Sequence, residues 1–247
     1  MIEKNLNKIK AIAFDFGGTL DIPGMHWFDF FWSQFEGELT NHGVTKEQYW
    51  DAYVYGERQM EKNGIPRDTS FEDTLTRKLN YQFEYLTDHC NLNQVDQKPC
   101  ILTEIIMSNG IPQIDDSLQT AAMIFKALSG SYDLSIVSNY YGNLETILKD
   151  HHIFDYLDRL IDSTIVGIRK PDPAIWKMAL DQSGVKPEEF LIIGDSMKND
   201  ILPAQSLGCP TVLITKKLLP QEYKGDWVGS LEMLAKLLGV ELTEKKQ

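Results

Sequence analysis

The chain has few cysteines and no apolar run long enough to span a membrane. Three of its 247 residues are cysteine, and Cys90, Cys100 and Cys209 have no Cys-x-x-Cys spacing. An odd number without that spacing argues against a disulfide framework and for reduced thiols. The first apolar stretch, Ala11–Phe14, is too short for the core of a signal peptide. We therefore expect a cytoplasmic protein that does not insert into a membrane.

The chain also lacks a basic excess, an internal repeat and any low-complexity tract apart from the polar tail Glu244–Gln247. Its 24 lysines and arginines are outnumbered by 36 aspartates and glutamates, which gives a formal net charge of −12. Such a chain repels phosphate backbones, so we expect no nucleic-acid partner. An anionic small molecule would need a locally positive site. No pattern indicates an oligomeric state.

The most informative segment that is present lies near the start of the chain. The apolar residues Ile12–Phe14 predict a buried strand, and the chain continues as Asp15-Phe16-Gly17-Gly18-Thr19-Leu20. A carboxylate at the end of a buried strand needs a partner there. Glycines beside it let backbone N–H groups approach an anion closely. This segment therefore predicts a functional site.

Three later segments repeat this arrangement of polar residues after apolar runs or turns. They are Ser138-Asn139 after Leu134–Val137, Lys170-Pro171 in a proline-rich turn, and Gly194-Asp195-Ser196 with Asp200 after Phe190–Ile193. Open parallel sheets bind ligands at the carboxyl ends of their strands. Because Asp15, Ser138 and Asp195 each follow a predicted strand, we expect them at one such edge.

Between these segments the pattern first becomes purely helical. Apolar and aromatic residues recur at helical spacing over Asp29–Leu39, Lys46–Lys62, Phe71–Tyr85 and Val95–Ser108. Thr45 with Gln48, and Ser70 with Asp73, predict helix starts. We interpret the aromatic residues of this block as the core of a helical bundle; they are Trp27, Phe28, Phe30, Phe31, Trp32 and Phe35.

From Asp115 onward helices and strands alternate. Strands are expected at Asp133–Val137, Leu160–Ile161, Phe190–Ile193 and Thr211–Thr215, with helices at 117–128, 144–151, 173–183 and 199–207 between or after them. Asp172 is expected to cap the third of these helices, with Pro173 as its first residue. Short apolar strands alternating with helices predict an α/β fold whose parallel sheet is covered on both faces. A chain of this length holds one large domain or a core with an insertion.

The chemistry of these residues suits a phosphoryl group and a hard cation. Asp15 and Asp195 at neighbouring strand ends would repel each other without a cation, and carboxylate oxygens suit Mg²⁺. Lys170 supplies a compact positive charge for a phosphoryl oxygen. The Ser138 hydroxyl and the Asn139 region can donate hydrogen bonds to the same group. An aspartate nucleophile would divide hydrolysis into two steps.

Together the four segments resemble the motifs of the haloacid dehalogenase-like (HAD) hydrolases, whose members are mostly phosphatases. The resemblance implies that Asp15 is the nucleophile and a ligand of Mg²⁺, that Ser138 and Lys170 bind phosphate, and that Asp195 binds the metal with Asp200 in support. Gly18 and Thr19 complete the first motif. It also implies a Rossmann-like three-layer core at 1–22 and 112–247 with an inserted all-helical cap at 23–111. We expect this cap to move relative to the core, with Gly24 and the stretch Gly110-Ile111-Pro112 as the places where the backbone absorbs the change.

One position departs from the resemblance. HAD phosphatases carry a second aspartate two residues after the nucleophile, and this chain has Gly17 there. The family's residue binds Mg²⁺ through its backbone carbonyl and acts as general acid and base through its side chain. Glycine keeps only the first role, and general acid–base catalysis contributes about 10²–10⁴ in rate. Asp21 and His26 follow soon after and are the candidates to replace the acid.

Three functions are compatible with this sequence. The first is a Mg²⁺-dependent hydrolase of a small phosphorylated metabolite, impaired for poor leaving groups. The second is a dehalogenase-like or phosphonoacetaldehyde hydrolase-like enzyme; Asp195 argues against dehalogenation, and the other reaction needs a cap lysine such as Lys46, Lys62 or Lys78. The third is a catalytically weak phosphate-binding or regulatory protein. No motif in the helical block indicates which substrate is bound.

Overall fold

A computed structural model describes residues 6–90, 100–220 and 223–242. Its centre is one six-stranded sheet with strand order β3-β2-β1-β4-β5-β6, and every neighbouring pair is parallel. The strands are β1 (Ala11–Phe14), β2 (Asp133–Ser138), β3 (Arg159–Asp162), β4 (Phe190–Gly194), β5 (Thr211–Ile214) and β6 (Asp226–Val228). The predicted α/β class with a parallel sheet is confirmed.

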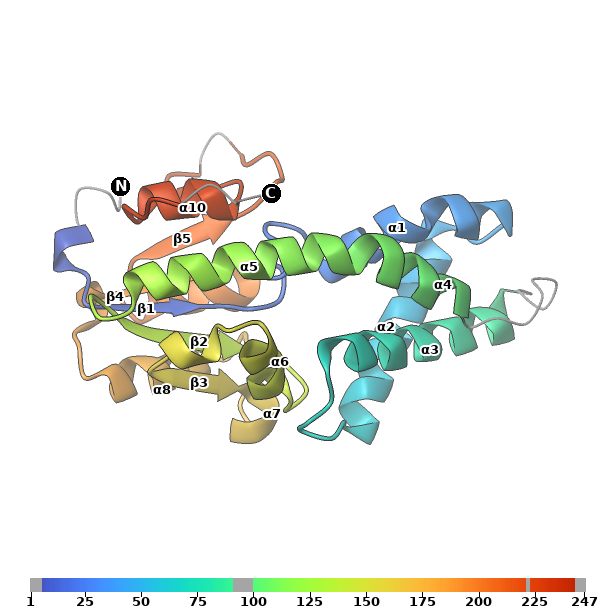
Figure 1. The fold of residues 1–247 in the computed structure, drawn as a ribbon, viewed down its shortest axis with the longest axis horizontal. Coiled ribbons are helices and arrows are strands. Elements are labelled where there is room, and N and C mark those ends of the chain that lie inside the picture. Colours follow the sequence, from blue (N-terminus) through green and yellow to red (C-terminus); the bar gives the residue numbers. More distant parts are fainter. Residues whose placement is uncertain (1–5, 91–99, 221–222, 243–247) are drawn as a thin grey trace. The chain divides into compact units, whose positions relative to one another are not determined.

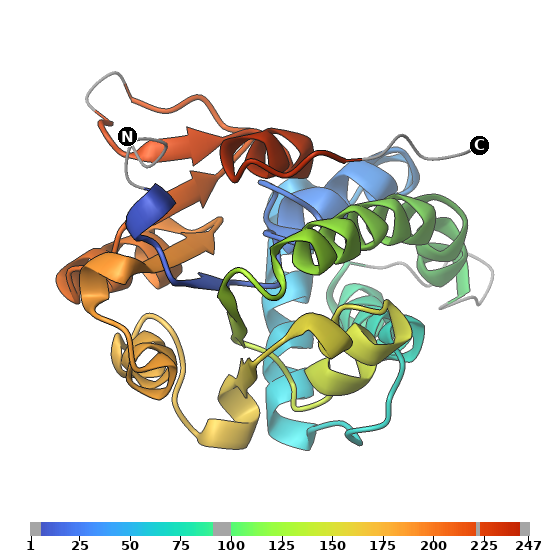
Figure 2. The same ribbon diagram turned by 60° about the vertical axis from the view of Figure 1, so that its left-hand side comes forward.

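Helices cover both faces of the sheet because successive strand residues point to opposite sides. Ala11 and Ala13 of β1 pack in a buried cluster with Trp176 of α8 (Ala174–Ser183). Phe14 instead packs on Phe125 of α5 (Ile111–Leu128), with ring centroids 4.6 Å apart. Figures 1 and 2 show α5 and α8 on opposite sides of the strands. This arrangement is the predicted three-layer core.

The remaining elements of the alternating region are short. They are η2 (Leu6–Lys8), α6 (Leu144–Asp150), η5 (Phe154–Tyr156), α7 (Ser163–Val166), η6 (Pro187–Glu189), η7 (Met197–Ile201), α9 (Leu202–Ser206) and α10 (Leu231–Leu237). The expected helix at 199–207 is thus a π-helical turn, η7, followed by α9.

Contacts divide the chain into two compact units. The sheet unit comprises 1–26, 115–140 and 148–247, and the helical unit comprises 27–114 and 141–147. The helical unit contains α1 (Trp27–Asn41), α2 (Lys46–Asn63), α3 (Phe71–His89), α4 (Cys100–Ile105) and the π-helical turn η4 (Ile106–Gly110). The expected start of the fourth helix at Val95 lies outside the described residues. The segment 141–147 comes from the loop after β2, so the helical unit is not one continuous insertion.

Side-chain packing within the helical unit follows the sequence pattern. Five of the six aromatic residues of α1 are buried, and Trp27 is half-buried, which confirms their place in a bundle core. Thr45 and Gln48 form the predicted capping box at the start of α2. Ser70 caps α3, where its hydroxyl accepts a hydrogen bond from the Asp73 N–H at 3.1 Å.

Two helix boundaries differ from the prediction. The helix α8 begins at Ala174, one residue late, with Pro173 at the capping position; Asp172 still accepts from the Ala174 N–H at 2.9 Å. The stretch Gly110-Ile111-Pro112 is the second expected hinge and the expected start of the core, yet η4 runs through it directly into α5. The Ile111 N–H bonds the Ile106 carbonyl in a π-type turn just before the proline.

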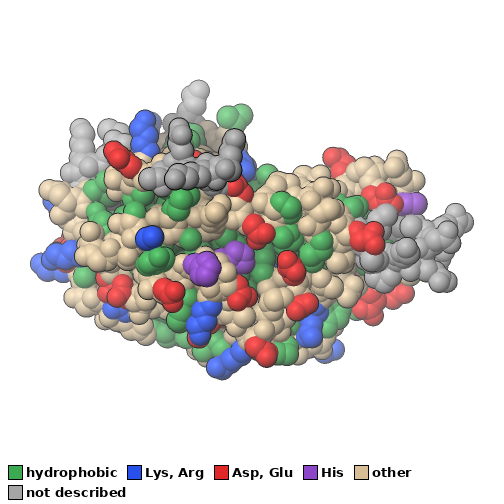
Figure 3. Space-filling model, viewed as in Figure 1, with side chains coloured by type: hydrophobic (Ala, Val, Ile, Leu, Met, Phe, Trp, Pro, Cys, Tyr) green, Lys and Arg blue, Asp and Glu red, His purple; other side chains and the backbone are tan. Residues whose placement is uncertain are grey.

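Surface charge and free thiols agree with the composition. On the face drawn in Figure 3, Lys and Arg side chains are scattered among Asp and Glu side chains. No helix within the described ranges is long and apolar enough to cross a bilayer. Cys90 is half-buried and Cys209 is buried, and both are free thiols. The side chain of Cys100 lies outside the described residues.

Candidate active site

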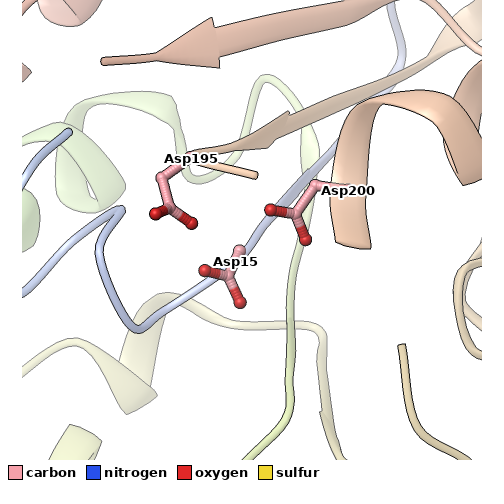
Figure 4. A group of neighbouring side chains, drawn as sticks. All are labelled: Asp15, Asp195 and Asp200. Atoms are coloured by element: carbon pink, nitrogen blue, oxygen red, sulfur yellow. The ribbon is translucent and has the colours of Figure 1, made fainter. Parts of the chain in front are cut away.

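Strand ends bring the predicted acids to one edge of the sheet. Asp15 directly follows β1, Asp195 directly follows β4, and Ser138 is the last residue of β2. Because β1 pairs in parallel with both β2 and β4, these carboxyl ends are neighbours. Figure 4 shows Asp15, Asp195 and Asp200 side by side, with the carboxylates of Asp195 and Asp200 on either side of Asp15.

Lys170 supplies the positive charge at this edge. Its Nζ lies 2.6 Å from Asp15 Oδ1 and 2.8 Å from Asp200 Oδ1, and its side chain is 2% exposed. Burial disfavours the charged form, but attraction to Asp15 and Asp200 outweighs burial and raises the pKa of Lys170. The ammonium group is therefore charged and held between two carboxylates.

Asp195 and Asp200 differ in how far their charge is balanced. Burial, with repulsion from Asp15 and Asp200, raises the pKa of the half-buried Asp195 to about 9. Burial also raises the pKa of Asp200, to about 6, because the nearby Lys170 only partly offsets it. Asp200 Oδ2 further accepts a hydrogen bond from the Ser196 N–H at 3.0 Å. Of these two acids, Asp195 is thus the one whose negative charge is less balanced by neighbouring groups.

The three acids fit a hard divalent cation. One oxygen of each of Asp15, Asp195 and Asp200 lies within 4.8 Å of the others. With all three acids ionised, as metal ligands must be, their three negative charges and the one positive charge of Lys170 would leave a formal charge of −2. A divalent ion would balance this charge and relieve the repulsion that raises the pKa of Asp195. Carboxylate oxygens are the donors that Mg²⁺ prefers.

Glycine is required at two positions because the side chains of these acids lie very close to the backbone there. Gly18 has φ +83°, and a Cβ atom there would lie 2.6 Å from Asp195 Oδ2. A Cβ atom on Gly194 would lie 2.5 Å from the side chain of Asp200. Any other residue at either position would displace an acid, so the glycines of both motifs serve the geometry of the site.

The other predicted residues of the site lie beside this group. The Thr19 hydroxyl donates to Asp15 Oδ2 at 3.1 Å. Asn139 binds the backbone of Lys170 twice: Nδ2 donates to the carbonyl at 3.0 Å, and Oδ1 accepts from the N–H at 2.9 Å. The Asn139 side chain therefore supports the lysine, while Ser138 is buried at the strand end.

Comparison with known proteins identifies the family. A family profile described as haloacid dehalogenase-like hydrolase matches residues 9–208, which contain all four motifs. The chain belongs to the HAD-like hydrolases. The predicted membership in this family is confirmed.

Two curated proteins and one solved structure are similar to this chain. The chain is 39% identical over 185 residues to the Rhythmically expressed gene 2 protein of Drosophila melanogaster, covering 73% of this chain and 62% of that protein. It is 26% identical over 212 residues to the phosphoglycolate phosphatase of Vibrio vulnificus (strain YJ016), covering 84% of each. A solved dehalogenase with an intermediate complex has the same fold, with a TM-score of 0.58, 20% identity and coverage of 95% and 99%. The chain spans about three fifths of the Drosophila protein.

Within this HAD-like site, the candidates to replace the acid missing at Gly17 are both poorly suited. Asp21 is buried, and its Oδ1 accepts from the N–H groups of Gly18 at 2.7 Å and Ile22 at 2.6 Å. Both bonds hold the carboxyl group on the backbone of its own turn. His26 is exposed. Asp21 instead fixes the turn that contains Gly17 and Gly18.

One contact of the HAD-like site was not foreseen from the sequence. The ring of Trp176 lies 4.3 Å from Lys170 Nζ, and its Nε1 donates to the Asn199 carbonyl at 3.0 Å. The available signal was an aromatic residue three positions after Pro173, in the first turn of the helix that follows Lys170. Sequence spacing alone also suits a core aromatic residue.

Proposed function

We propose that this HAD-like hydrolase is a Mg²⁺-dependent phosphatase that acts on a small phosphorylated metabolite through an aspartyl-phosphate on Asp15. The observation that carries the proposal is the buried Asp15–Lys170–Asp200 arrangement beside Asp195. The similarity to a phosphoglycolate phosphatase supports the reaction class.

The residues divide the reaction into two steps. An oxygen of Asp15 attacks phosphorus, a P–O bond to Asp15 forms, and the bond to the leaving group breaks. Water then attacks the phosphorus, loses a proton to the solvent and releases phosphate and the Asp15 carboxylate. Lys170 and the Ser138 hydroxyl stabilise the negative charge on the phosphoryl oxygens. The leaving group departs without a proton from residue 17, because that residue is glycine.

Magnesium would be held by Asp15, Asp195 and the Gly17 carbonyl, with Asp200 in support. When bound, it would supply charge neutralisation for the phosphoryl group. The donor set and the formal charge of −2 support this assignment. We further propose that the helical unit acts as the cap that selects the substrate.

The absent acid predicts which phosphate esters react. Acyl and aryl phosphates have leaving groups that need no proton, so they should be hydrolysed measurably. Alkyl and sugar phosphates should be slow. Gly17 is not among the glycines with positive φ, so an aspartate can adopt its backbone conformation. Gly17→Asp should raise alkyl phosphate hydrolysis about 10²-fold.

The decisive measurement is kcat/KM against leaving-group pKa for the wild type and Gly17→Asp. A steep dependence in the wild type that flattens in the variant supports the proposal. Asp15→Asn is the matched control and should abolish both activities. Fast sugar-phosphate turnover by the wild type, without such a dependence, would mean that another residue supplies the acid.

A catalytically weak binding protein is the second candidate, and Gly17 is the observation that favours it. Beryllium fluoride with Mg²⁺ mimics the aspartyl-phosphate and tests the pocket without turnover. An adduct that needs Asp15, together with no hydrolysis of any phosphate in the panel, would favour the binding protein over the enzyme.

A further inference from the structure

One buried side chain, that of Trp176, contacts both Lys170 and the backbone next to Asp200. Trp176 is fully buried in the cluster between the sheet and α8. Its ring face lies 4.3 Å from Lys170 Nζ, while the indole edge donates to the Asn199 carbonyl at 3.0 Å. A ring that only filled the core would need neither contact.

The ring face completes the surroundings of a buried cation. Two of the directions around Lys170 Nζ are taken by Asp15 and Asp200, and the side chain is 2% exposed. The third N–H of an ammonium removed from water still needs a partner. Tryptophan is the aromatic residue that attracts a cation best, and the attraction grows when the pair is desolvated.

The indole edge acts on the other partner through the backbone. Asn199 directly precedes Asp200, and its own N–H donates to the Ser196 hydroxyl at 3.1 Å. Ser196 also donates its N–H to Asp200 Oδ2. The turn that places Asp200 is therefore fixed by Ser196 from within and by Trp176 from α8.

We propose that Trp176 is a positioning residue that sets the Lys170–Asp200 ion pair, and through it the orientation of Asp15. This inference rests on the proposed phosphatase function. Trp176→Leu removes both contacts, and Trp176→Phe keeps a ring face but removes the N–H donor. Misplacement of reacting groups by about 1 Å can cost 10²-fold in rate.

The test compares these variants with a matched core variant, Phe190→Leu. Phe190 belongs to the same buried cluster and begins β4, at the opposite end of that strand from Asp195. We expect Trp176→Leu to lower kcat for p-nitrophenyl phosphate at least about tenfold with KM within about threefold. Trp176→Phe should recover part of that loss, and Phe190→Leu should keep kcat despite a comparable fall in Tm. Equal kcat for Trp176→Leu and Phe190→Leu would overturn the proposal.

A second readout needs no turnover, so it separates this inference from the proposed function. In protein labelled with ¹⁵N-tryptophan, Lys170→Met should shift the indole N–H resonance of Trp176. The control Lys177→Met changes an exposed lysine on the same helix that pairs with Asp181, and it should leave that resonance in place. An unmoved resonance in Lys170→Met would overturn the positioning role, whether or not the wild type is a phosphatase.

Discussion

The Asp195 carboxyl lies half-buried beside two other acids, and burial with their repulsion raises its pKa to about 9. Without a cation it is therefore protonated at neutral pH. Since a metal binds the carboxylate, Mg²⁺ must displace that proton, and its apparent affinity should rise with pH toward 9.

The same pKa shift determines how the stability of the folded protein depends on pH. The pKa of Asp195 in the folded protein lies above its unfolded value of about 3.9. Its contribution to stability is therefore full below pH 4 and is lost as pH rises toward 9. We expect the increase in Tm caused by MgCl₂ to grow from pH 6 to pH 9, as measured by scanning calorimetry.

Asp195→Asn tests the same residue by removing its charge. Asparagine cannot ionise, so most of the Mg²⁺-dependent increase in Tm should disappear, along with most of the stimulation of activity by Mg²⁺. Asp172→Asn, which changes an exposed acid at the start of α8, is the control. A variant that binds Mg²⁺ as tightly as the wild type would contradict the assignment of Asp195 as a ligand.

Among the elements of the helical unit, α2 and α3 are joined by a partly buried ion pair. Lys78 Nζ lies 2.6 Å from Glu57 Oε1, with side chains 6% and 33% exposed. Four aromatic rings surround the ammonium at 5.3 to 5.9 Å from their centroids; they are Trp27, Phe31, Tyr53 and Tyr141. The Tyr141 hydroxyl donates to Glu57 Oε2 at 2.6 Å. This pair therefore links α1, α2, α3 and the segment 141–147.

Removing Glu57 should lower the free energy of unfolding more than removing Lys78. Glu57→Gln leaves the buried Lys78 charge without its counter-ion, and should cost about 3 kcal/mol. Lys78→Met leaves a carboxylate that is one third exposed and still bonded to Tyr141, so its cost should stay within about 1 kcal/mol. Urea unfolding of both variants measures the difference. Equal losses of unfolding free energy in the two variants would contradict the argument that the buried charge of Lys78 depends on Glu57.

The Glu57 carboxyl also predicts a pH dependence. Burial opposes its charge, but Lys78 and the hydroxyl donors outweigh burial and lower its pKa. Stabilisation by this group is therefore present above its unfolded pKa of about 4.3 and is lost as pH falls through the lower folded value. The stability difference between wild type and Glu57→Gln should shrink below about pH 4.

The sequence predicted the long helices and the central strands because their periodicity and caps are local signals. It did not predict β6 and α10, since β6 has only three residues and its Trp227 is 50% exposed. The helical path through Pro112 was missed because a π-type turn depends on a backbone bond that composition does not encode. At the site, motif spacing found the acids and Lys170. The contacts of Asn139 and Trp176 depend on the fold that brings β2, α8 and η7 together.

For the whole molecule, the two units suggest that the helical unit moves as one body. Gly24, an expected hinge, is bonded to the sheet unit by its N–H to the Gly18 carbonyl and by its carbonyl to the Lys216 N–H. Flexing at this end should therefore occur after Gly24, near the division at 26–27. The other expected hinge, at Gly110–Pro112, lies within continuous helix.

Spin labels on the two units can test this motion. With the native cysteines replaced by serine, labels at Lys62→Cys and Lys177→Cys would report one distance distribution across the units. We expect it to narrow when Mg²⁺ and beryllium fluoride are added, while a pair placed within the helical unit should not change. An identical distribution in both conditions would contradict a moving cap.

The segment 141–147 also limits where related proteins can be recombined into chimaeras. Asn143 Nδ2 donates to the Thr69 carbonyl at 2.9 Å and to the Thr74 hydroxyl at 2.8 Å, and the Thr146 hydroxyl donates to the Arg67 carbonyl at 2.8 Å. A gene fusion that swapped only 27–114 for a relative's helices would leave these donors without acceptors. Recombination between family members should therefore yield folded chimaeras when both stretches are inherited from the same parent.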